Sequence, residues 1–224
     1  LEEAAENLGL TPFQRVLKIS FPLVLPALSA GGLLALIHAI APDLDYPEAA
    51  TLPVAIQTMH DAIATHGALR AGQSVLIQGA SSGVGLMGLQ IARELGAGLV
   101  IGSSTSPDKR ARLEAFGAGL TIDTRDAGWV DAVLSATDGK GVDIVIDQLA
   151  GPLFNDTMRA TRIGGRIVNV GRMAGERSEV DFDLHSMRRI TYVGVTFRTR
   201  SGREVVELVQ RARDDLAGAI AARR

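Results

Sequence analysis

The sequence predicts an α/β protein with a doubly wound parallel sheet, preceded by an α-helical segment. From Asp43 onward, short apolar runs alternate with amphipathic helical patterns. The first apolar run leads through a glycine-rich turn into a helix, and 224 residues with 46% hydrophobic content can bury a substantial core. Strands separated by crossover helices pair in parallel with right-handed connections, which places helices on both faces of the sheet.

The near-neutral composition excludes several classes of function. A formal net charge of -2 gives no basic footprint, so we expect no nucleic-acid partner. The absence of cysteine excludes thiol catalysis, disulfides and thiolate zinc sites, and we expect no metal site. No secretory signal is expected, because the stretch from Leu1 to Glu6 is acidic, and we therefore expect a cytoplasmic protein.

The first unit, residues 1–41, differs in kind from the rest of the chain. Thr11-Pro12-Phe13-Gln14 combines an N-cap, a first-turn proline and a capping-box residue, which predicts a short helix to about Ser20. Residues 23–41 contain no acidic or basic side chain except His38 and are just long enough to cross a bilayer core. Hydropathy alone leaves open a membrane helix or a buried helix docked on the following domain.

Residues 42–224 form the second predicted unit. A helix opens at Pro47 and runs to about Thr65, and the last helix spans residues 203–222. Helical periodicity also covers residues 107–116 and 129–136. Strands are predicted at residues 74–78, 99–101, 142–147, 166–170 and 190–196.

The turn after the first strand has the composition of a pyrophosphate site. The strand from Ser74 to Gln78 is followed by Gly79-Ala80-Ser81-Ser82-Gly83-Val84-Gly85 and then by a helix. Small residues let the backbone approach the phosphates, and the positive end of the helix dipole faces their charge. We therefore predict that the cofactor contacts Ser81, Ser82, Gly83, Val84 and Gly85.

The residues about twenty positions after this turn favour NADPH over NADH. An NAD site usually carries Asp or Glu there, which accepts a hydrogen bond from the ribose 2′-hydroxyl. This chain instead has Gly102-Ser103-Ser104-Thr105-Ser106, followed by Lys109 and Arg110. Hydroxyls and cations suit a 2′-phosphate, whereas a carboxylate would repel it. The alternative for both cations is a solvated first turn of helix.

The nicotinamide end of the cofactor is expected at the carboxyl edge of the later strands, where ligands of open α/β sheets bind. The candidates are Gln148-Leu149-Ala150 after the strand at residues 142–147, Gly171-Arg172-Met173 after the strand at 166–170, and Phe197-Arg198-Thr199 after the strand at 190–196. Gly171 could instead be a turn glycine, and Phe197 could be a core residue.

Two other enzyme classes share this kind of turn. A short-chain dehydrogenase needs Tyr-x-x-x-Lys, but Tyr46 is followed four positions on by Ala50, and Tyr192 by Thr196. An α/β-hydrolase remains an alternative, because Gly79 to Gly83 satisfies G-x-S-x-G and a Ser, Asp and His follow in the required order. The residues of this hypothetical triad are Ser81, Asp147 and His185.

Several motifs occur together in one order along residues 42–224. They are Glu48-Ala49-Ala50-x-Leu52-Pro53, Leu69 to Ile77, the glycine turn, Lys109, Gly117-Ala118, Gly141-Val142-Asp143, Asp147, Gly164-Gly165-Arg166 and Gly194-Val195-Thr196. This series resembles the quinone oxidoreductase group of the zinc-free medium-chain dehydrogenases/reductases. The chain departs from the family pattern at Ser82, commonly glycine, and at Thr124, where many members have a cofactor-contacting tyrosine.

The resemblance implies a Rossmann-type NADP-binding domain of an oxidoreductase that transfers hydride from NADPH to a quinone or an α,β-unsaturated carbonyl compound. It also implies cofactor contacts from Ser103, Ser104, Lys109 and Thr124. The family's N-terminal domain and closing segment have no counterpart here, so we expect an incomplete cleft, poor turnover and no catalytic residue in this chain. A homodimer through the edge strand near residues 190–196 is a further expectation.

The first unit carries a resemblance of its own. Glu3-Ala4-Ala5, Gly9, Ile19 and Pro22 match the spacing of the cytoplasmic loop of ABC-transporter permeases, E-A-A-x3-G-x9-I-x-L-P, and only Phe21 departs from it. The resemblance implies a permease fragment that came by gene fusion or an artificial junction. It provides the alternative hypothesis of a membrane-associated interaction module, held at an inner membrane through residues 23–41.

Overall fold

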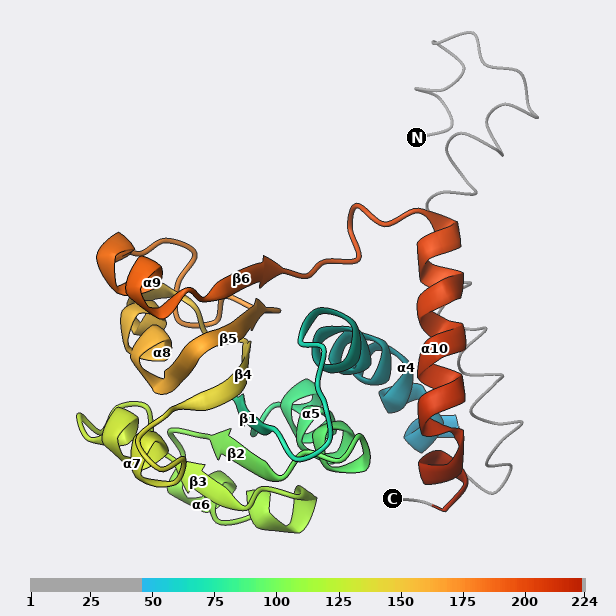
Figure 1. Ribbon diagram of the computed structural model, residues 1–224. Helices are drawn as coiled ribbons and strands as arrows, with labels where there is room; N and C mark the ends of the chain where they lie inside the picture. Colours follow the sequence, from blue (N-terminus) through green and yellow to red (C-terminus); the bar gives the residue numbers. More distant parts are fainter. Residues whose placement is uncertain (1–45, 223–224) are drawn as a thin grey trace, which may run out of the picture.

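The computed structural model describes residues 46–222 (Figure 1). The predicted permease-like unit, residues 1–41, and its apolar run, residues 23–41, lie outside the described residues. Among the helices that are described, none combines the length and the apolar character required to cross a membrane.

The sheet is six-stranded, every neighbouring pair is parallel, and the strand order is β3-β2-β1-β4-β5-β6. The strands are β1 Ser74–Ile77, β2 Leu99–Ser103, β3 Leu120–Ile122, β4 Val142–Asp147, β5 Thr161–Asn169 and β6 Thr191–Gly194. The order reverses between β1 and β4, and a crevice at that point is where doubly wound sheets bind dinucleotides. The predicted fold class is confirmed.

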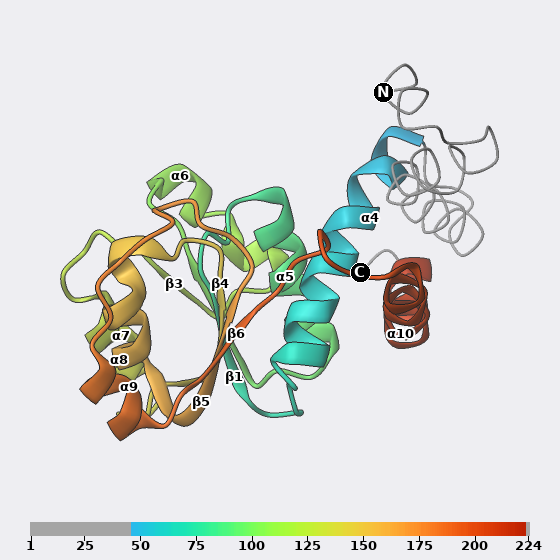
Figure 2. The same cartoon turned by 90° about the horizontal axis from the view of Figure 1, so that it is seen from above.

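Helices form a layer on each face of the sheet (Figures 1 and 2). One layer holds α4 Tyr46–His60, the π-helix η2 Asp61–His66 and α5 Gly83–Glu94, with α10 Gly202–Ala221 packed outside α4. The other layer holds α7 Trp129–Ser135, α8 Phe154–Ala160 and α9 Phe182–Arg188. Short helical turns complete the set: α6 Pro107–Arg110, η3 Leu113–Phe116 and η4 Gly151–Leu153.

Strand β1 shows why the sheet must lie between two layers. Val75 and Ile77 are fully buried in the apolar cluster that includes Leu89 of α5. Leu76 is also fully buried, but it belongs to the cluster on the opposite face, which includes Met158 of α8. Because successive side chains of a strand point to opposite faces, a run that is apolar at every position requires cover on both.

Several elements differ from the prediction. The first helix is α-helical only to His60 and continues as a π-helix, and the helix expected at residues 107–116 is two short pieces, α6 and η3. Strand β5 starts at Thr161, five positions earlier than expected. Strand β3 was not predicted, because three residues are too few to establish a period. Helices α8 and α9, of seven residues each, were also missed, whereas α7 of the same length was predicted.

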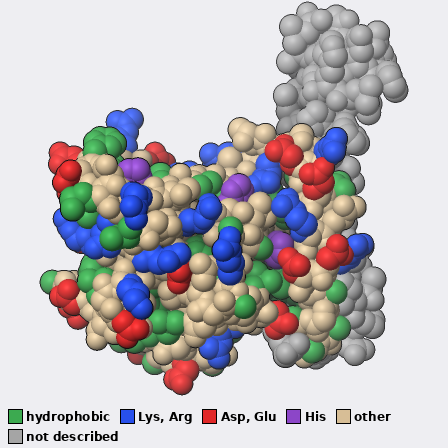
Figure 3. Space-filling model, in the orientation of Figure 1, with side chains coloured by type: hydrophobic (Ala, Val, Ile, Leu, Met, Phe, Trp, Pro, Cys, Tyr) green, Lys and Arg blue, Asp and Glu red, His purple; other side chains and the backbone are tan. Residues whose placement is uncertain are grey.

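The surface charge is distributed rather than concentrated on one element. On the face that Figure 3 presents, Lys and Arg side chains spread across the middle of the described part, and Asp and Glu side chains lie mainly toward its rims.

Candidate cofactor-binding site

The glycine turn joins β1 to α5 in the way a phosphate-binding turn requires. Ser82 is the N-cap of α5, and its Oγ accepts a hydrogen bond from the Gly85 amide at 3.0 Å. Gly79 has φ +69, a conformation that favours glycine. A Cβ at Gly85 would lie 2.5 Å from the Gly79 carbonyl oxygen, so only glycine lets the helix approach the end of the strand this closely.

The first residue of α5 leaves the helix N-terminus open. Gly83 is exposed, and a Cβ placed on it would meet nothing within 4 Å. The first amides of the twelve-residue helix are therefore accessible to an anion, and the helix dipole favours negative charge there.

A groove of about 260 Å³ begins at this turn and runs over the carboxyl ends of the strands β1, β2 and β4. Six of the predicted contact residues line it: Ser81, Ser82, Ser103, Ser104, Lys109 and Thr124. The other lining residues are Gly79 and Thr105, together with Leu149 and Met173 from the stretches predicted for the nicotinamide end. Among these six residues, Ser81 and Thr124 are 43 positions apart in the sequence, and the structure brings them to the same groove.

Three serines tie the turn to the end of β2. The buried Ser103 Oγ accepts a hydrogen bond from the Gly79 amide at 3.0 Å. Ser104 Oγ donates to Ser81 Oγ at 2.9 Å. These hydroxyls lie at one end of the groove and can exchange such mutual bonds for bonds to a ligand's oxygen atoms.

Lys109 stands at the same end of the groove, on the short helix α6. Its backbone amide donates to Ser106 Oγ at 3.4 Å, so Ser106 caps the turn that carries it. Its side chain is exposed, and among residues 46–222 it has no salt bridge. An ammonium group free of a carboxylate partner suits a phosphate of a bound nucleotide.

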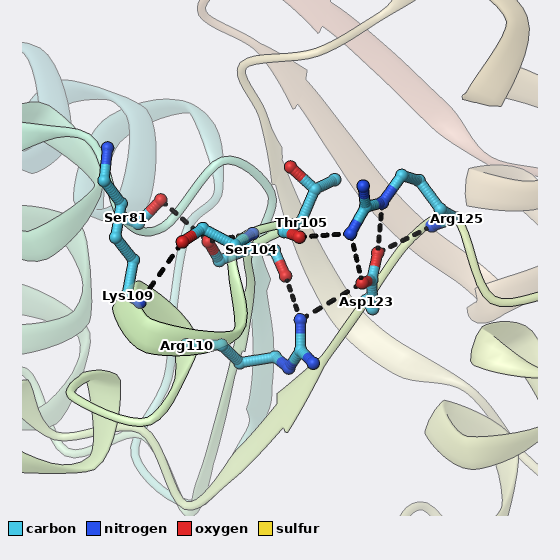
Figure 4. Close-up of polar contacts among 8 residues, drawn as sticks. Ser81, Ser104, Thr105, Lys109, Arg110, Asp123 and Arg125 are labelled. Atoms are coloured by element: carbon cyan, nitrogen blue, oxygen red, sulfur yellow. Dashed lines mark hydrogen bonds and ion pairs between the residues drawn. The ribbon is translucent and has the colours of Figure 1, made fainter.

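Beneath this end of the groove lies a cluster of two arginines and one carboxylate (Figure 4). Arg110 Nη1 donates to the Ser104 carbonyl oxygen at 2.7 Å and to Asp123 Oδ2 at 3.1 Å. Arg125 donates from Nη2 to Asp123 Oδ2 at 2.9 Å and to the carbonyl oxygen of Thr105. Hydrogen bonds from Arg125, helped by the charges of both guanidinium groups, lower the pKa of Asp123 to about 2.

Gln148 connects the glycine turn to the end of β4. Its Nε2 donates to the Gln78 carbonyl oxygen at 2.9 Å, and its Oε1 accepts from Ser82 Oγ at 3.1 Å. Its side chain is buried, and it does not line the groove. Gln148, which was predicted to contact the cofactor, therefore holds the turn in place through its side-chain amide.

Asp147 supports the loop that follows β4. Its Oδ1 accepts hydrogen bonds from the amides of Leu149 and Ala150, both at 2.8 Å, and the residue is fully buried. Burial raises the pKa of Asp147 above its ordinary value of 3.8, although these two amides oppose the shift. Leu149, which lines the groove, is thereby fixed at the strand end.

The remaining predicted contacts do not line the groove. Val84 packs against the apolar core, and Gly85 is buried against the turn. A Cβ at Gly171 would lie 2.7 Å from the Gln148 carbonyl oxygen, so this glycine permits close packing of two loops. Phe197 and Arg198 lie beyond β6, where the Arg200 guanidinium stacks 5.5 Å from the centre of the Phe197 ring.

The triad of the hydrolase alternative is not assembled. Ser81 Oγ accepts from Ser104, and Asp147 holds backbone amides. His185 lies in α9, and in the described part of the chain no hydrogen bond joins it to either residue. A nucleophile without a base in hydrogen-bond reach lacks the activation that acyl transfer needs.

Reasoning from the sequence missed the cluster beneath the groove. It placed Arg110 near the cofactor but overlooked Asp123 and Arg125, because it did not recognise the three-residue strand β3 that precedes them. An acidic residue two positions before an arginine, directly after a strand of alternating apolar residues, was the available signal.

The sheet order, the phosphate turn and the groove define a dinucleotide-binding domain of the doubly wound class. Residues 83–211 match the family model described as zinc-binding dehydrogenase, and the chain belongs to this family. It has the cofactor-binding domain of the medium-chain dehydrogenases/reductases, whose cofactor is a nicotinamide dinucleotide.

The residues present do not fit the zinc ion in the family's description. The chain has no cysteine, and nowhere in residues 46–222 do three His, Cys, Asp or Glu side chains gather as metal ligands would. We therefore derive no step that involves zinc.

The curated relatives include large biosynthetic enzymes. A highly reducing polyketide synthase, pkhB of Emericella nidulans, is 31% identical over 160 residues, which are 70% of this chain and 6% of that protein. The spectinabilin polyketide synthase system protein NorB of Streptomyces orinoci is 34% identical over 184 residues, 78% of this chain and 8% of that protein. The chain thus spans less than a tenth of the length of these relatives.

Solved structures share the fold. A quinone oxidoreductase from Pseudomonas syringae has TM-score 0.71 and 25% identity, covering 80% of this chain and 56% of that chain. A probable oxidoreductase from Mycobacterium abscessus has TM-score 0.68 and 31% identity, covering 81% of this chain and 53% of the other. The mycobacterial Rv1454c complexed with NADPH has TM-score 0.71 at 22% identity over 80% of this chain and 56% of that chain, which shows the fold alone.

Proposed function

We propose that this chain is the NADPH-binding domain of a reductase that transfers hydride to the double bond of an α,β-unsaturated carbonyl compound or to a quinone. The observation that carries the proposal is the polar end of the groove. There, two serine hydroxyls and the Lys109 ammonium stand where an NAD-specific site would hold a carboxylate.

The chain's own residues divide the binding of the dinucleotide. The amides at the start of α5, capped by Ser82, are placed for the pyrophosphate. Ser104 and Lys109 are placed for the 2′-phosphate of the adenosine. Leu149 and Met173, which lie next to Gly79 of the turn, give the groove an apolar wall, and we assign the nicotinamide ring to this wall.

NADPH supplies the hydride when it is bound, and the protein's part is to orient it. Gln148 holds the turn through the Gln78 carbonyl group and the Ser82 hydroxyl, which fixes the floor beneath the pyrophosphate. We assign no proton-transfer role to a described residue. The cleft is completed by a second domain, as in the family that residues 42–224 resemble, and exclusion of water from the reacting atoms depends on it.

The choice of substrate class follows the relatives. Two matching structures are titled enoyl reductases, CurK at 24% identity and JamJ at 23%, and the curated relatives are polyketide synthases. An enoyl group and a quinone both contain a carbon–carbon double bond conjugated with a carbonyl group, so both present an electron-poor acceptor for hydride.

Titration calorimetry with NADPH and NADH tests the proposal. We expect NADPH to bind more tightly, and Lys109→Glu to weaken NADPH by about tenfold or more while NADH changes little, because the reversed charge repels only the 2′-phosphate. Lys140→Glu is the matched control. Lys140 is exposed and lies just before β4, at the amino ends of the strands, whereas the groove lies at their carboxyl ends. Equal binding of the two nucleotides, or no binding to folded protein, would refute the proposal.

We further propose a homodimer through β6. Within residues 46–222 this strand pairs with β5 alone, and Thr191 and Tyr192 are exposed. An unpaired strand edge is a template for pairing with a second chain. Sedimentation equilibrium should give twice the monomer mass. The Val195 amide donates to the Asn169 carbonyl oxygen of β5, so the alternating Gly194 amide faces the free edge. Gly194→Pro should return a monomer, because proline cannot donate a ladder hydrogen bond at that edge.

A further inference from the structure

The loop that joins β2 to α6, residues 104–106, is held from two sides. On the groove side, Ser104 Oγ donates to Ser81 Oγ at 2.9 Å. On the other side lie the two arginines and Asp123. Figure 4 shows Ser81 and Lys109 on one side of Thr105, and Asp123 with Arg125 on the other.

Each arginine bridges this loop to the same carboxylate. Arg110 joins the Ser104 carbonyl oxygen, at 2.7 Å, to Asp123, at 3.1 Å. Arg125 joins the Thr105 carbonyl oxygen to both oxygens of Asp123, at 2.9 and 3.2 Å. We call these three charged residues, Arg110, Asp123 and Arg125, the loop clamp.

The loop clamp determines where the two carbonyl oxygens point. Neither arginine lines the groove, so carbonyl groups that accept from them are directed away from it. A carbonyl oxygen facing a phosphate would repel it, and the loop clamp turns the carbonyl groups of Ser104 and Thr105, two residues that line the groove, toward the arginines. A loop that is already ordered in the free protein loses less conformational entropy when the ligand binds, and this raises the affinity.

We propose that the loop clamp is the device that gives this site its preference for a 2′-phosphate, and that Asp123 is its positioning residue. The inference rests on the proposed binding of NADPH. Asp123 does not line the groove; it acts through Arg110 and Arg125, which hold the carbonyl groups of the loop.

A purely electrostatic role of Asp123 and a positioning role predict opposite effects of one substitution on phosphate binding, so the substitution distinguishes the two roles. If only the charge of the carboxylate mattered, Asp123→Asn would remove a negative group beneath the site and tighten the binding of a phosphate. If Asp123 positions the loop, the same substitution leaves one acceptor oxygen in place of two and removes the charge that holds both arginines, which weakens the binding. Asp108→Asn is the matched control, because it removes an exposed negative charge beside Lys109 without touching the loop clamp.

The probes are 2′,5′-ADP and 5′-AMP, which differ by the 2′-phosphate and are bound by the adenosine half of the groove alone. By calorimetry, we expect Asp123→Asn to weaken 2′,5′-ADP by about tenfold and 5′-AMP by less than about twofold. Asp108→Asn should leave both affinities within about twofold or tighten 2′,5′-ADP. Unchanged or tighter binding of 2′,5′-ADP by Asp123→Asn overturns the inference.

Arg125→Lys keeps the test decisive if the Asp123 variant does not fold. Arg125 is 66% exposed, and lysine preserves its charge but cannot reach the Thr105 carbonyl group and both Asp123 oxygens at once. Weaker 2′,5′-ADP binding supports the loop clamp, and unchanged binding overturns it. A wild-type chain that binds 2′,5′-ADP no better than 5′-AMP instead refutes the proposed NADPH function, and the inference falls with it.

Discussion

The glycine turn offers a paired substitution that separates folding from cofactor binding. In Gly85→Ala the new Cβ would lie 2.5 Å from the Gly79 carbonyl oxygen and 2.7 Å from Ala80 Cα. In Gly83→Ala it would meet nothing within 4 Å. The two substitutions add the same methyl group two positions apart on one helix, but only the first forces α5 away from β1.

The expected loss of stability follows from these distances. Overpacking costs about 1–3 kcal/mol, and because every close atom is backbone that cannot rotate away, the upper part of the range applies to Gly85→Ala. Replacing a helical glycine by alanine returns about 0.5–1 kcal/mol, which leaves a net loss of about 1–2 kcal/mol. For a domain of this size, the melting temperature should fall by about 2–8 °C.

Thermal unfolding followed by circular dichroism, combined with NADPH titration, checks both variants. Gly85→Ala should melt lower than wild type. Gly83→Ala should melt at or above wild type yet bind NADPH more weakly, because its methyl group occupies the open approach to the helix amides. An unchanged melting temperature for Gly85→Ala, or an equal fall for Gly83→Ala, would refute the reasoning that close approach of helix and strand is the role of Gly85.

Other consequences concern titration and packing. Carboxyl NMR titration should give Asp123 a pKa of about 2, and Arg125→Gln should move it back toward 3.8. The stabilisation from Asp123 is therefore present above pH 3.8 and is lost as the pH falls toward 2. Asp147 behaves oppositely, because its pKa is raised in the folded protein. Its contribution to the free energy of unfolding is complete below pH 3.8 and is lost as the pH rises through the folded pKa. Denaturant unfolding should show that Asp147→Asn removes this pH dependence. Leu216→Ala in α10 should lower the free energy of unfolding by about 2–5 kcal/mol, because Leu216 is buried in the core. Val206→Ala, in the same helix at a position 55% exposed, should change it little. Equal effects of the two substitutions would contradict the docking of α10 on the core.

The long, strongly patterned elements were predictable from the sequence. The glycine turn, β4 and α10 begin and end within a residue or two of their expected positions, because a turn signal, an apolar run or a capping box is encoded locally. Short elements were not predictable. Strand β3 has three residues, and it forms because β2 offers it a parallel edge rather than because its own residues demand a strand.

The candidate site divides in the same way. Residues within the turn and after β2 were predicted, since a phosphate site requires small residues and hydroxyls at known spacing. The role of Gln148 was not predicted, because a side chain that holds a loop is of the same residue type as one that contacts a ligand. For Gly171 the alternative of a turn glycine was stated, and the structure shows it packed against the Gln148 carbonyl oxygen. Met173 was one of the candidates after β5, and the path of that loop makes it a wall of the groove.

The sequence by itself determined the class of fold, the order of the longer strands and helices, and the residue types at the phosphate turn and at the end of β2, since periodicity, turn chemistry and charge are properties of neighbouring residues. Only the tertiary structure decided which residues share the groove, which way the carbonyl groups of Ser104 and Thr105 point, and that one carboxylate, Asp123, holds two arginines from different elements. The physical reason is that hydrogen bonds between distant segments depend on the three-dimensional path of the backbone, which no local pattern specifies.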